Sequence, residues 1–257
     1  MLAREQKVAV AAAKEAGKII RRFCKKGFLV SKKGAIDLVT DADIAAQKKI
    51  ISVISKGFPR DDFLGEESGK KNLSGGRVWV IDPVDGTTNF AHKFPWFATS
   101  IGLFDSGEKL GVVLDPLRND LYTVQKGGGA FLNGKQIFVS KNKLLIDCLF
   151  ATGFPYERGE LAQKTVQSIG SLVGACQGVR RLGSAVLDFS FVARGALDGF
   201  FEYKLFPWDA AAGILLVREA GGKVTGINGE PVDCFSTHFL SSNGLVHGHL
   251  EKLLVRA

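Results

Sequence analysis

Apolar residues recur every three or four positions over residues 2–25, with lysines and arginines between them. Because this spacing places the apolar side chains on one face of a helix, it predicts an amphipathic helix over residues 2–25. A second helix is predicted over residues 42–56, with Thr40 as its N-cap and Gly57-Phe58-Pro59 ending it. Residues 27–39, between the two helices, are predicted to form a hairpin or a loop.

The chain that follows has short apolar runs, each bounded by turn residues, which is typical of strands. These runs lie at residues 63–64, 78–81, 99–104, 111–114 and 121–124. Gly127-Gly128-Gly129 and Asn133-Gly134 supply the residue types that hairpin turns need. The first half of the chain is therefore predicted to be two helices followed by a meandering sheet.

A second set of strands and helices begins near residue 146. Strands are predicted at 146–150, 177–179, 199–203 and 223–226, and helices at 157–174, 184–194, 210–220 and 245–255. Because every apolar face needs a partner, two helix-covered sheets stacked in layers are expected. No linker separates the halves, so we predict a single domain over residues 1–257 with two packed halves, about 1–143 and 144–257.

The composition, with 46% hydrophobic and 23% charged residues, is that of an ordinary soluble globular protein. Lys14, Glu15 and Lys18 interrupt the apolar residues of the N-terminus, which therefore lacks the apolar core of a signal peptide. No uninterrupted apolar run approaches the roughly 18 residues of a membrane span. We therefore expect a cytoplasmic protein with no membrane partner.

The cysteines and histidines form no strong metal or disulfide pattern. The four cysteines are far apart and make no CxxC pair, so we expect buried free thiols. They are Cys24, Cys148, Cys176 and Cys234. His247-Gly248-His249 has chelating spacing, but we interpret it as a solvated turn before the C-terminal helix.

The formal net charge is +8, from 34 lysines and arginines and 26 aspartates and glutamates. A basic surface concentrates anions, either phosphorylated metabolites or nucleic acid. The basic residues are scattered along the chain, in pairs such as Lys48-Lys49 and Arg180-Arg181. No basic stretch interleaved with aromatic residues, as in single-strand binders, is present. Charge alone indicates an anionic partner without selecting one.

Several acidic residues lie at the ends of apolar runs or at helix starts, where structural roles alone explain them only weakly. In WVIDPVDGTTNF, residues 79–90, an apolar run ends in Asp82 and Asp85. Asp43 lies in the first turn of the second helix, Glu66 follows an apolar stretch, and Asp209 begins another apolar helix. Each has an ordinary interpretation singly, as a turn former, a cap or a favourable charge near a helix N-terminus.

Taken together, these acids predict a cation site. Ligand sites collect at the ends of interior strands and at helix N-termini. Carboxylates that converge there repel one another unless cations neutralise them. No histidine or cysteine ligand stands nearby, and coordination by oxygen alone selects magnesium, manganese or calcium over zinc.

The turn after Asp85 supplies the complementary feature. Gly86-Thr87-Thr88 offers free backbone N–H groups at the start of a short helix, and such groups bind phosphate oxygens. A metal cluster beside an anion-binding turn is what hydrolysis of a phosphate monoester requires. One cation prepares a water nucleophile, and another stabilises the departing alkoxide.

The residues that carry this chemistry resemble the inositol monophosphatase family. Its two signature segments are similar to residues 79–90 and to WDAAAGILLVREAGG, residues 208–222. Supporting segments are DLVTDAD at 37–43, GEES at 65–68 and RLGSA at 181–185. They occur in the family's order and span most of the chain.

The resemblance implies a layered α-β-α-β-α sandwich of the inositol monophosphatase and fructose-1,6-bisphosphatase type, and a homodimer. It also implies two or three Mg²⁺ ions per active site, with Mn²⁺ as a substitute. The metal ligands would be Glu66, Asp82, the carbonyl of Val84, Asp85 and Asp209. Asp85 would bridge two metals.

The resemblance assigns further roles. Glu66, Thr87 and Asp43 would be catalytic, with Asp43 orienting Thr87 and the attacking water. Substrate contacts would come from Asp85, Gly86, Thr87, Arg181, Ser184, Ala185, Glu202 and Asp209. Lys32 would lie on a mobile loop over the site, although Lys33 fits the alignment equally well.

The leading hypothesis is a Mg²⁺-dependent phosphomonoesterase that hydrolyses inositol 1-phosphate, or a related sugar or polyol phosphate, to the free alcohol and phosphate. Fructose 1,6-bisphosphate is an alternative substrate, alone or alongside inositol phosphate, with Arg180 or Arg181 binding the second phosphate. 3′-Phosphoadenosine 5′-phosphate is less favoured because no adenine-stacking motif is present. A hypothesis from another class is a regulatory protein that binds RNA or the transcription machinery.

Overall fold

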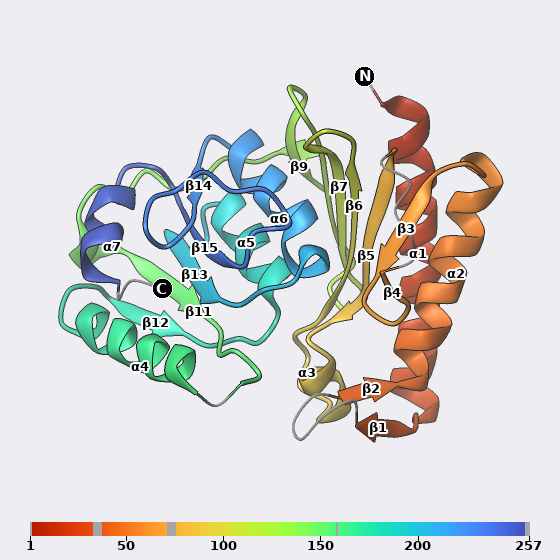
Figure 1. The fold of residues 1–257 in the computed structure, drawn as a ribbon, viewed down its shortest axis with the longest axis horizontal. Helices are drawn as coiled ribbons and strands as arrows, with labels where there is room; N and C mark the ends of the chain where they lie inside the picture. Colours follow the sequence, from red (N-terminus) through yellow and green to blue (C-terminus); the bar gives the residue numbers. More distant parts are fainter. Residues whose placement is uncertain (1, 33–37, 71–75, 158, 255–257) are drawn as a thin grey trace.

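The computed structural model describes residues 2–32, 38–70, 76–157 and 159–254. It contains two large β-sheets with helices outside the first, between the two, and outside the second (Figure 1). The α-helices are α1 (Ala3–Lys26), α2 (Asp41–Gly57), α3 (Thr87–Ala91), α4 (Glu160–Val173), α5 (Ala185–Ala193), α6 (Pro207–Glu219) and α7 (His247–Leu253). The expected layered α-β-α-β-α fold is therefore confirmed.

The first sheet has eight strands in the order β10-β9-β8-β7-β6-β5-β3-β4. They are β3 (Asp62–Gly65), β4 (Gly69–Lys70), β5 (Val78–Asp85), β6 (Ala98–Phe104), β7 (Glu108–Asp115), β8 (Asp120–Gln125), β9 (Gly129–Leu132) and β10 (Lys135–Gln136). Neighbours are antiparallel except β3 and β5, which run parallel. Short turns join β6 through β10, which gives the predicted meander, while α3 lies between β5 and β6.

The second sheet has five strands in the order β12-β11-β13-β15-β14. They are β11 (Leu149–Thr152), β12 (Gly178–Arg180), β13 (Gly199–Tyr203), β14 (Lys223–Thr225) and β15 (His238–Ser242). The first three are mutually parallel, whereas β15 runs antiparallel to both of its neighbours. A small hairpin of β1 (Val30–Lys32) and β2 (Leu38–Thr40) precedes α2, and a 3₁₀ turn, η1 (Leu145–Asp147), precedes β11.

Helix α6 holds the layers at a fixed distance. It is apolar on all sides, and residues 210–217 are buried between the two sheets. A Cβ atom at Gly102 of β6 would lie 2.8 Å from Cβ of Ala211, and one at Gly111 of β7 would lie 3.0 Å from Ala212. The missing side chains let α6 approach the first sheet closely, so the position of its N-terminus is tightly set.

A buried aspartate fixes the segment that leads from the first sheet into the second. Asp198 accepts hydrogen bonds from Ser140 Oγ (2.5 Å), Asn142 Nδ2 (3.0 Å) and the Leu149 N–H (2.7 Å). Asn243 Nδ2 donates to Ser140 Oγ and to the Asn142 carbonyl, both at 2.9 Å. This network satisfies buried polar groups while holding the connection against the second sheet.

Most predicted elements are confirmed, although β4 was not predicted and some other expectations differ from the structure. Strand β15 was not predicted, and the strand expected at 146–150 begins only at Leu149, after η1. The sequence HFLSS of β15 ends in two serines, so its apolar signal is weak although the strand lies in the middle of the sheet. Cys24 is exposed, so the expectation of buried thiols holds for the other three cysteines only.

The interpretation of His247 as part of a solvated turn is wrong. The residue is buried at the start of α7, with its ring between the hydroxyls of Thr225 (2.9 Å) and Ser242 (2.8 Å). Burial and the nearby Lys223 lower the pKa of His247 to about 4, while Glu251 opposes the shift. The ring is therefore neutral and has a structural role, because it exchanges hydrogen bonds with two hydroxyl groups.

Among the helices of the described residues, none combines the length and apolar content that a membrane crossing needs.

The packing of α6 predicts opposite effects for two glycine substitutions. Gly102→Ala should lower the free energy of unfolding by about 1–3 kcal/mol, because the added methyl group would press on Ala211. Gly170→Ala, in α4, should raise it by about 0.5–1 kcal/mol, because nothing lies within 4 Å of the added atom and alanine favours the helix. Urea unfolding measures both, and equal shifts would contradict this packing.

Candidate active site

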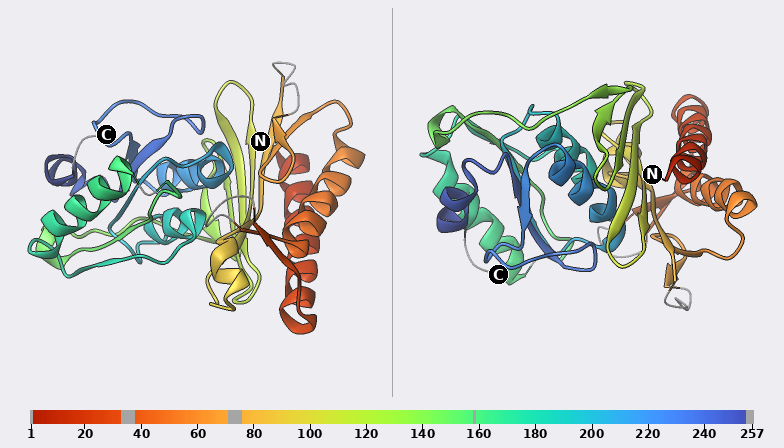
Figure 2. Two further views of the ribbon diagram at one scale, coloured as in Figure 1. Left: turned by 60° about the horizontal axis from the view of Figure 1, so that its bottom comes forward. Right: turned by 90° about the horizontal axis from the view of Figure 1, so that it is seen from above.

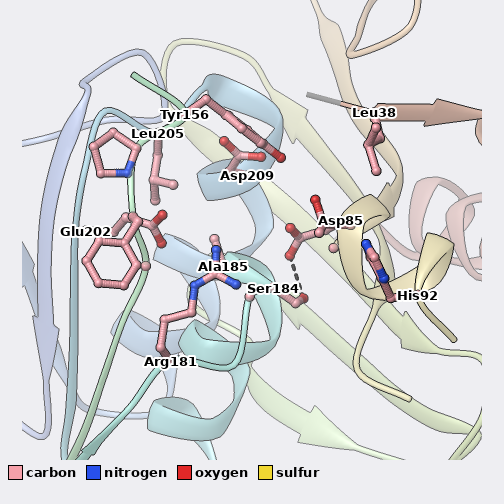
Figure 3. Close-up of a pocket in the computed structure, with 16 residues that line it drawn as sticks. Leu38, Asp85, His92, Tyr156, Arg181, Ser184, Ala185, Glu202, Leu205 and Asp209 are labelled. Atoms are coloured by element: carbon pink, nitrogen blue, oxygen red, sulfur yellow. Dashed lines mark hydrogen bonds between the residues drawn. The ribbon is translucent and has the colours of Figure 1, made fainter. Parts of the chain in front are cut away.

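A cavity of about 500 Å³ lies between the end of β5, with α3, and the second half of the chain. Figure 3 shows its side chains: Asp85 and His92 face Arg181, Glu202 and Asp209 across the space. The walls therefore combine the strand end that the sequence singled out with residues from the second half of the chain. Ser184, Ala185 and Gly86 also line it, as predicted for substrate contacts.

Strand β5 carries the two central acids into this cavity. All eight of its residues are buried, and its pairing with β6 shifts register between Asp82 and Asp85. Such an irregularity bends a strand and redirects its side chains. The Val84 N–H donates to Asp82 Oδ1 (2.9 Å), which fixes the bend. Both carboxylates thus reach one side of the strand end despite their odd spacing.

Gly86 makes the turn from β5 into α3. Its φ of 96° lies in the left-handed region, and a Cβ atom there would lie 3.0 Å from the carbonyl oxygens of both Gly183 and Trp96. Glycine alone combines that conformation with that crowding. The turn presents the backbone N–H groups at the start of α3 beside the cavity, where the sequence predicted phosphate binding.

Three carboxylates converge at the strand end. Asp82, Asp85 and Asp209 each offer an oxygen within 4.8 Å of those of the other two. Asp209 comes from the first turn of α6, where the Phe206 N–H donates to its Oδ2 (2.8 Å). Glu66 follows β3 beside β5, and its N–H donates to the Ile81 carbonyl (3.1 Å). The structure therefore brings three of the five predicted metal ligands into one cluster, with Glu66 close enough for its charge to act on Asp82.

The pKa values of these acids show that each carboxylate disfavours the charged form of its neighbours. Burial raises the pKa of Asp82 well above its ordinary value, and the charges of Glu66, Asp85 and Asp209 raise it further. Burial likewise raises the pKa of Asp209, with Asp85 as the next cause. Oxygen donors that are buried and mutually repelling fit a hard divalent cation such as Mg²⁺, Mn²⁺ or Ca²⁺. The residues present therefore suit the cofactor that the family resemblance implies.

Asp43 and Thr87 form a buried pair at the edge of this cluster. Thr87 Oγ1 lies 3.0 Å from Asp43 Oδ1 and 2.9 Å from the Val84 carbonyl. The Thr40 N–H donates to Asp43 Oδ2 (2.9 Å), and the Thr40 hydroxyl contacts the same oxygen. Burial raises the pKa of Asp43, while the bonds from Thr40 and Thr87 oppose the shift. Asp43 therefore closes the capping box of α2 with one oxygen and meets Thr87 with the other.

The fifth predicted ligand, the Val84 carbonyl, accepts the Thr87 hydroxyl in this structure. Asp85 has a second task that the sequence did not indicate. Its Oδ2 accepts hydrogen bonds from Ser184 Oγ and from the Val186 N–H, both at 2.7 Å. Burial raises the pKa of Asp85 to about 6 against these two bonds. The acid thus joins the two halves of the molecule at the N-terminus of α5.

The second half also supplies the far wall. Glu202 of β13 fits against Gly153, where a Cβ atom would lie 2.0 Å from Glu202 Oε1. Burial and the charge of Asp85 raise the pKa of Glu202 to about 8, while Arg181 opposes the shift. The Arg181 guanidinium lies 6.0 Å from the ring centre of Phe154. Glu202 and Arg181 were predicted to contact substrate, whereas Gly153 and Phe154 were not predicted.

Asp188 of α5 was also missed. It is only 1% exposed, and its Oδ1 has no hydrogen-bond partner among the described residues. Burial raises its pKa well above the ordinary value, with Glu202 and Asp85 adding to the shift and Arg181 opposing it. Its sequence signal, an aspartate within an apolar helix, was present but resembled an ordinary first-turn acid.

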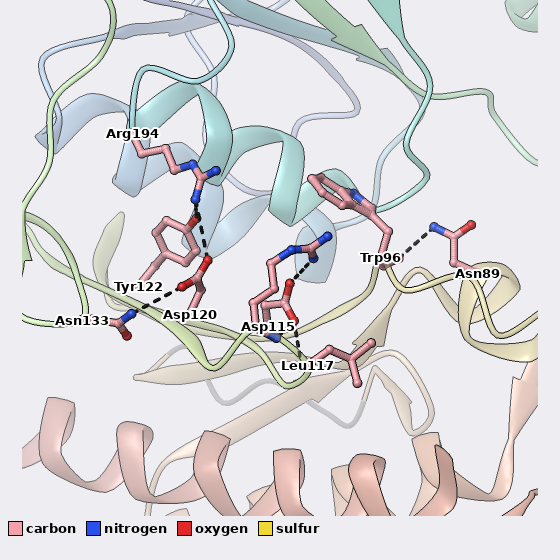
Figure 4. Close-up of polar contacts among 9 residues, drawn as sticks. Asn89, Trp96, Asp115, Leu117, Asp120, Tyr122, Asn133 and Arg194 are labelled. Carbon is pink, nitrogen blue, oxygen red and sulfur yellow. Dashed lines mark hydrogen bonds and ion pairs between the residues drawn. The ribbon is translucent and has the colours of Figure 1, made fainter. Parts of the chain in front are cut away.

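A polar contact holds the cavity's two sides together. Asn89 Nδ2 in α3 donates to the carbonyl oxygens of Trp96 and Leu182, both at 2.8 Å. Figure 4 shows the Asn89–Trp96 contact together with Arg194, which directly follows α5 and meets Tyr122 Oη (3.3 Å) and Asp120 (3.6 Å) on β8. Lys32 ends β1, but its side chain and Lys33 lie outside the described part of the chain, as does most of the predicted mobile loop.

Comparisons with known proteins agree with this geometry. A model of the inositol monophosphatase family matches residues 1–257. The chain is 45% identical over 226 residues to the Nus factor SuhB of Escherichia coli strain K12, across 86% of this chain and 85% of that protein. It is 43% identical over 227 residues to an inositol-1-monophosphatase of Rhizobium meliloti strain 1021, with 86% and 85% covered. The crystal structure of extragenic suppressor protein suhB from Bartonella henselae matches with a TM-score of 0.91 at 38% identity, over 96% of each chain. The protein described here therefore belongs to the inositol monophosphatase family.

Proposed function

We propose that this protein is a Mg²⁺-dependent phosphomonoesterase that hydrolyses inositol 1-phosphate or a related sugar or polyol phosphate. The observation that carries the proposal is the convergence of Asp82, Asp85 and Asp209 beside the Gly86 turn, at a cavity of about 500 Å³. That volume accommodates a small phosphorylated alcohol. Family membership and the likeness to an inositol-1-monophosphatase support the same chemistry.

The acidic cluster would hold the cations. Glu66, Asp82, Asp85 and Asp209 supply carboxylate oxygens, with the Val84 carbonyl as a further donor. Magnesium, when bound, supplies positive charge that neutralises the phosphate and makes water more acidic. The backbone N–H groups after Gly86 orient the phosphate from the other side.

Thr87 and Asp43 would direct the attacking water. A water molecule in front of Thr87 can donate a hydrogen bond to Oγ1, because the hydroxyl proton points toward Asp43 Oδ1 or the Val84 carbonyl. As the water attacks phosphorus and the bond from phosphorus to the alcohol oxygen breaks, the water proton would pass to Thr87 Oγ1 and the hydroxyl proton to Asp43 Oδ1, while the departing alkoxide takes a proton from solvent. The buried carboxylate, with its raised pKa, is a suitable proton acceptor. This path needs no histidine.

The far wall would select the alcohol. The carboxylate of Glu202 would accept hydrogen bonds from substrate hydroxyls, and Ser184 and Ala185 would border the ring. Arg181 at the rim is the residue that a second phosphate would meet, as in fructose 1,6-bisphosphate. We further propose a homodimer, as the family resemblance implies, and a cytoplasmic location, as the composition of the N-terminus suggests.

A second candidate function is a role in transcription. It is favoured by the 45% identity to a protein named Nus factor SuhB. The two functions do not exclude each other, because an enzyme with a complete acidic cluster can also bind a macromolecular partner.

Removal of the central carboxylate charge should stop turnover. Asp85→Asn should lower kcat by about 10³-fold or more, because it weakens cation binding while its Oδ1 still accepts from Ser184 and Val186. The control Asp105→Asn removes the same charge from an exposed turn between β6 and β7 and should leave kcat unchanged. Phosphate release with Mg²⁺ is the measurement, and an active Asp85→Asn enzyme would refute the assignment.

The acidic cluster also predicts how stability depends on pH when EDTA removes metals. The pKa of Asp85 is about 6 in the folded protein and about 3.9 when unfolded, so unfolded Asp85 releases its proton first. Relative to Asp85→Asn, the wild type should therefore lose stability as pH rises from about 4 to 6. Saturating Mg²⁺ at pH 7.5 should restore the stability that the wild type loses relative to Asp85→Asn. Thermal unfolding measures both stabilities, and a stability difference between the two proteins that does not change with pH would contradict the raised pKa of Asp85.

Glu202 should act on the alcohol and not on the phosphate. At a pH above about 8, where Glu202 is ionised, Glu202→Gln should raise KM for inositol 1-phosphate about tenfold, the effect of losing one charged hydrogen bond of about 1.5 kcal/mol. Hydrolysis of 4-nitrophenyl phosphate, which has no hydroxyls, should change little. Initial rates of the wild type on inositol 1-phosphate, fructose 1,6-bisphosphate and 3′-phosphoadenosine 5′-phosphate rank the substrates. A preference for the adenosine compound would overturn the proposed polyol substrate.

A further inference from the structure

The solvent side of α1 carries a straight row of lysines. Lys7, Lys14, Lys18 and Lys25 are all exposed and follow one another at steps of seven, four and seven residues. With 3.6 residues per turn, these steps place the four side chains within about 40° of arc on the helix. At 1.5 Å per residue the row is about 27 Å long. We call these four residues the lysine row.

Most charges around the lysine row have the same sign. Helix α1 has eight basic residues and two glutamates, so it carries six of the eight net positive charges of the chain. Figure 2 shows α1 and α2 side by side as the outermost layer, and the exposed Lys48, Lys49 and Lys56 extend the positive face onto α2. Basic residues that are scattered along the sequence are thus gathered on one surface.

The stability of α1 does not require this arrangement. Lys14 and Lys18, like Lys18 and Arg22, are four residues apart on the helix, and like charges at that spacing destabilise it. Among the described residues, the carboxylate that pairs with the row is Glu15, whose Oε1 lies 2.5 Å from Lys18 Nζ. The other glutamate of α1, Glu5, pairs with Arg77. Most of the row's charge is therefore left for a partner.

We propose that the lysine row binds the phosphate backbone of a double-stranded nucleic acid. A duplex carries one negative charge per 1.7 Å of its axis, or about 16 charges along the 27 Å of the row. Lysine binds phosphate as a point charge without reading base edges, so the contact is independent of sequence.

Two other anionic partners fit this face less well. A single strand needs aromatic side chains on which its bases stack, and the lysine row has none. A membrane surface favours helices that also insert large apolar side chains, and no large apolar residue of α1 is exposed. The row lies on α1, outside the first sheet, whereas the active-site cavity is lined by the turn after β5, by α3 and mostly by residues of the second half. A bound duplex would leave that cavity accessible.

The test is binding of the full-length protein to a 20-base-pair RNA duplex and to a DNA duplex of equal length, followed by fluorescence anisotropy. Four phosphate contacts predict a slope of about −4 for log K against log of the salt concentration. The association constant should then fall about 10²-fold between 50 and 200 mM KCl. Substitution of the row by glutamine, K7Q/K14Q/K18Q/K25Q, should remove most of this slope.

The matched control is K135Q/K141Q/K143Q/K252Q, which removes the same four charges from exposed positions outside α1 and α2. It should keep the wild-type slope and affinity. Circular dichroism and phosphatase activity should stay unchanged in both variants, since none of these lysines lines the cavity. Preference for RNA would mean that the row fits A-form geometry, and equal binding of both duplexes would mean that it fits the backbone alone. Equal weakening in both variants, binding only to anionic lipid vesicles, or no binding at 50 mM KCl would overturn the proposal.

Discussion

The mutual repulsion of buried carboxylates is the constraint on which the site depends. Asp82, Asp85 and Asp209 are held within 4.8 Å of one another, largely out of contact with water, and Glu66 stands beside them. In such surroundings each charge raises the pKa of the others, so the cluster must bind protons or cations. The protein can hold this arrangement only because backbone elements fix each acid independently. Oxygen donors that repel one another in this way suit a hard divalent cation.

Three parts of the fold provide the fixation. The irregular pairing of β5 turns Asp82 and Asp85 to the same side, and close packing of α6 against glycines of the first sheet places Asp209. The bonds from Ser184 and Val186 to Asp85 tie the first half to the second. Asp43 also has two roles, since the carboxylate that caps α2 accepts a hydrogen bond from Thr87. Structural and chemical tasks therefore share the same atoms.

The sequence was informative where chemistry and local geometry coincide. Hydrophobic periodicity placed nearly every helix and most strands, because burial of one face imposes its period on the chain. It failed for β15, whose serines are buried by neighbouring strands, and for His247, which is neutral and hydrogen-bonded inside the second half. The contacts of Val186 with Asp85 and of Gly153 with Glu202 were not predicted, because a backbone N–H and a missing side chain leave no recognisable sequence pattern.

By itself, the sequence determined the reactive turn. The order of aspartates, glycine and threonine in residues 79–90 dictates a strand end, a left-handed turn and a short helix, and these are local properties. Only the tertiary structure decided what surrounds that turn. The Ser184 hydroxyl donates to Asp85, and the missing side chain of Gly153 leaves room for Glu202. Packing also places α1 and its lysines on the outer surface. Such relations join residues far apart in the sequence, and they arise from packing of the sheets and helices, which no local pattern encodes.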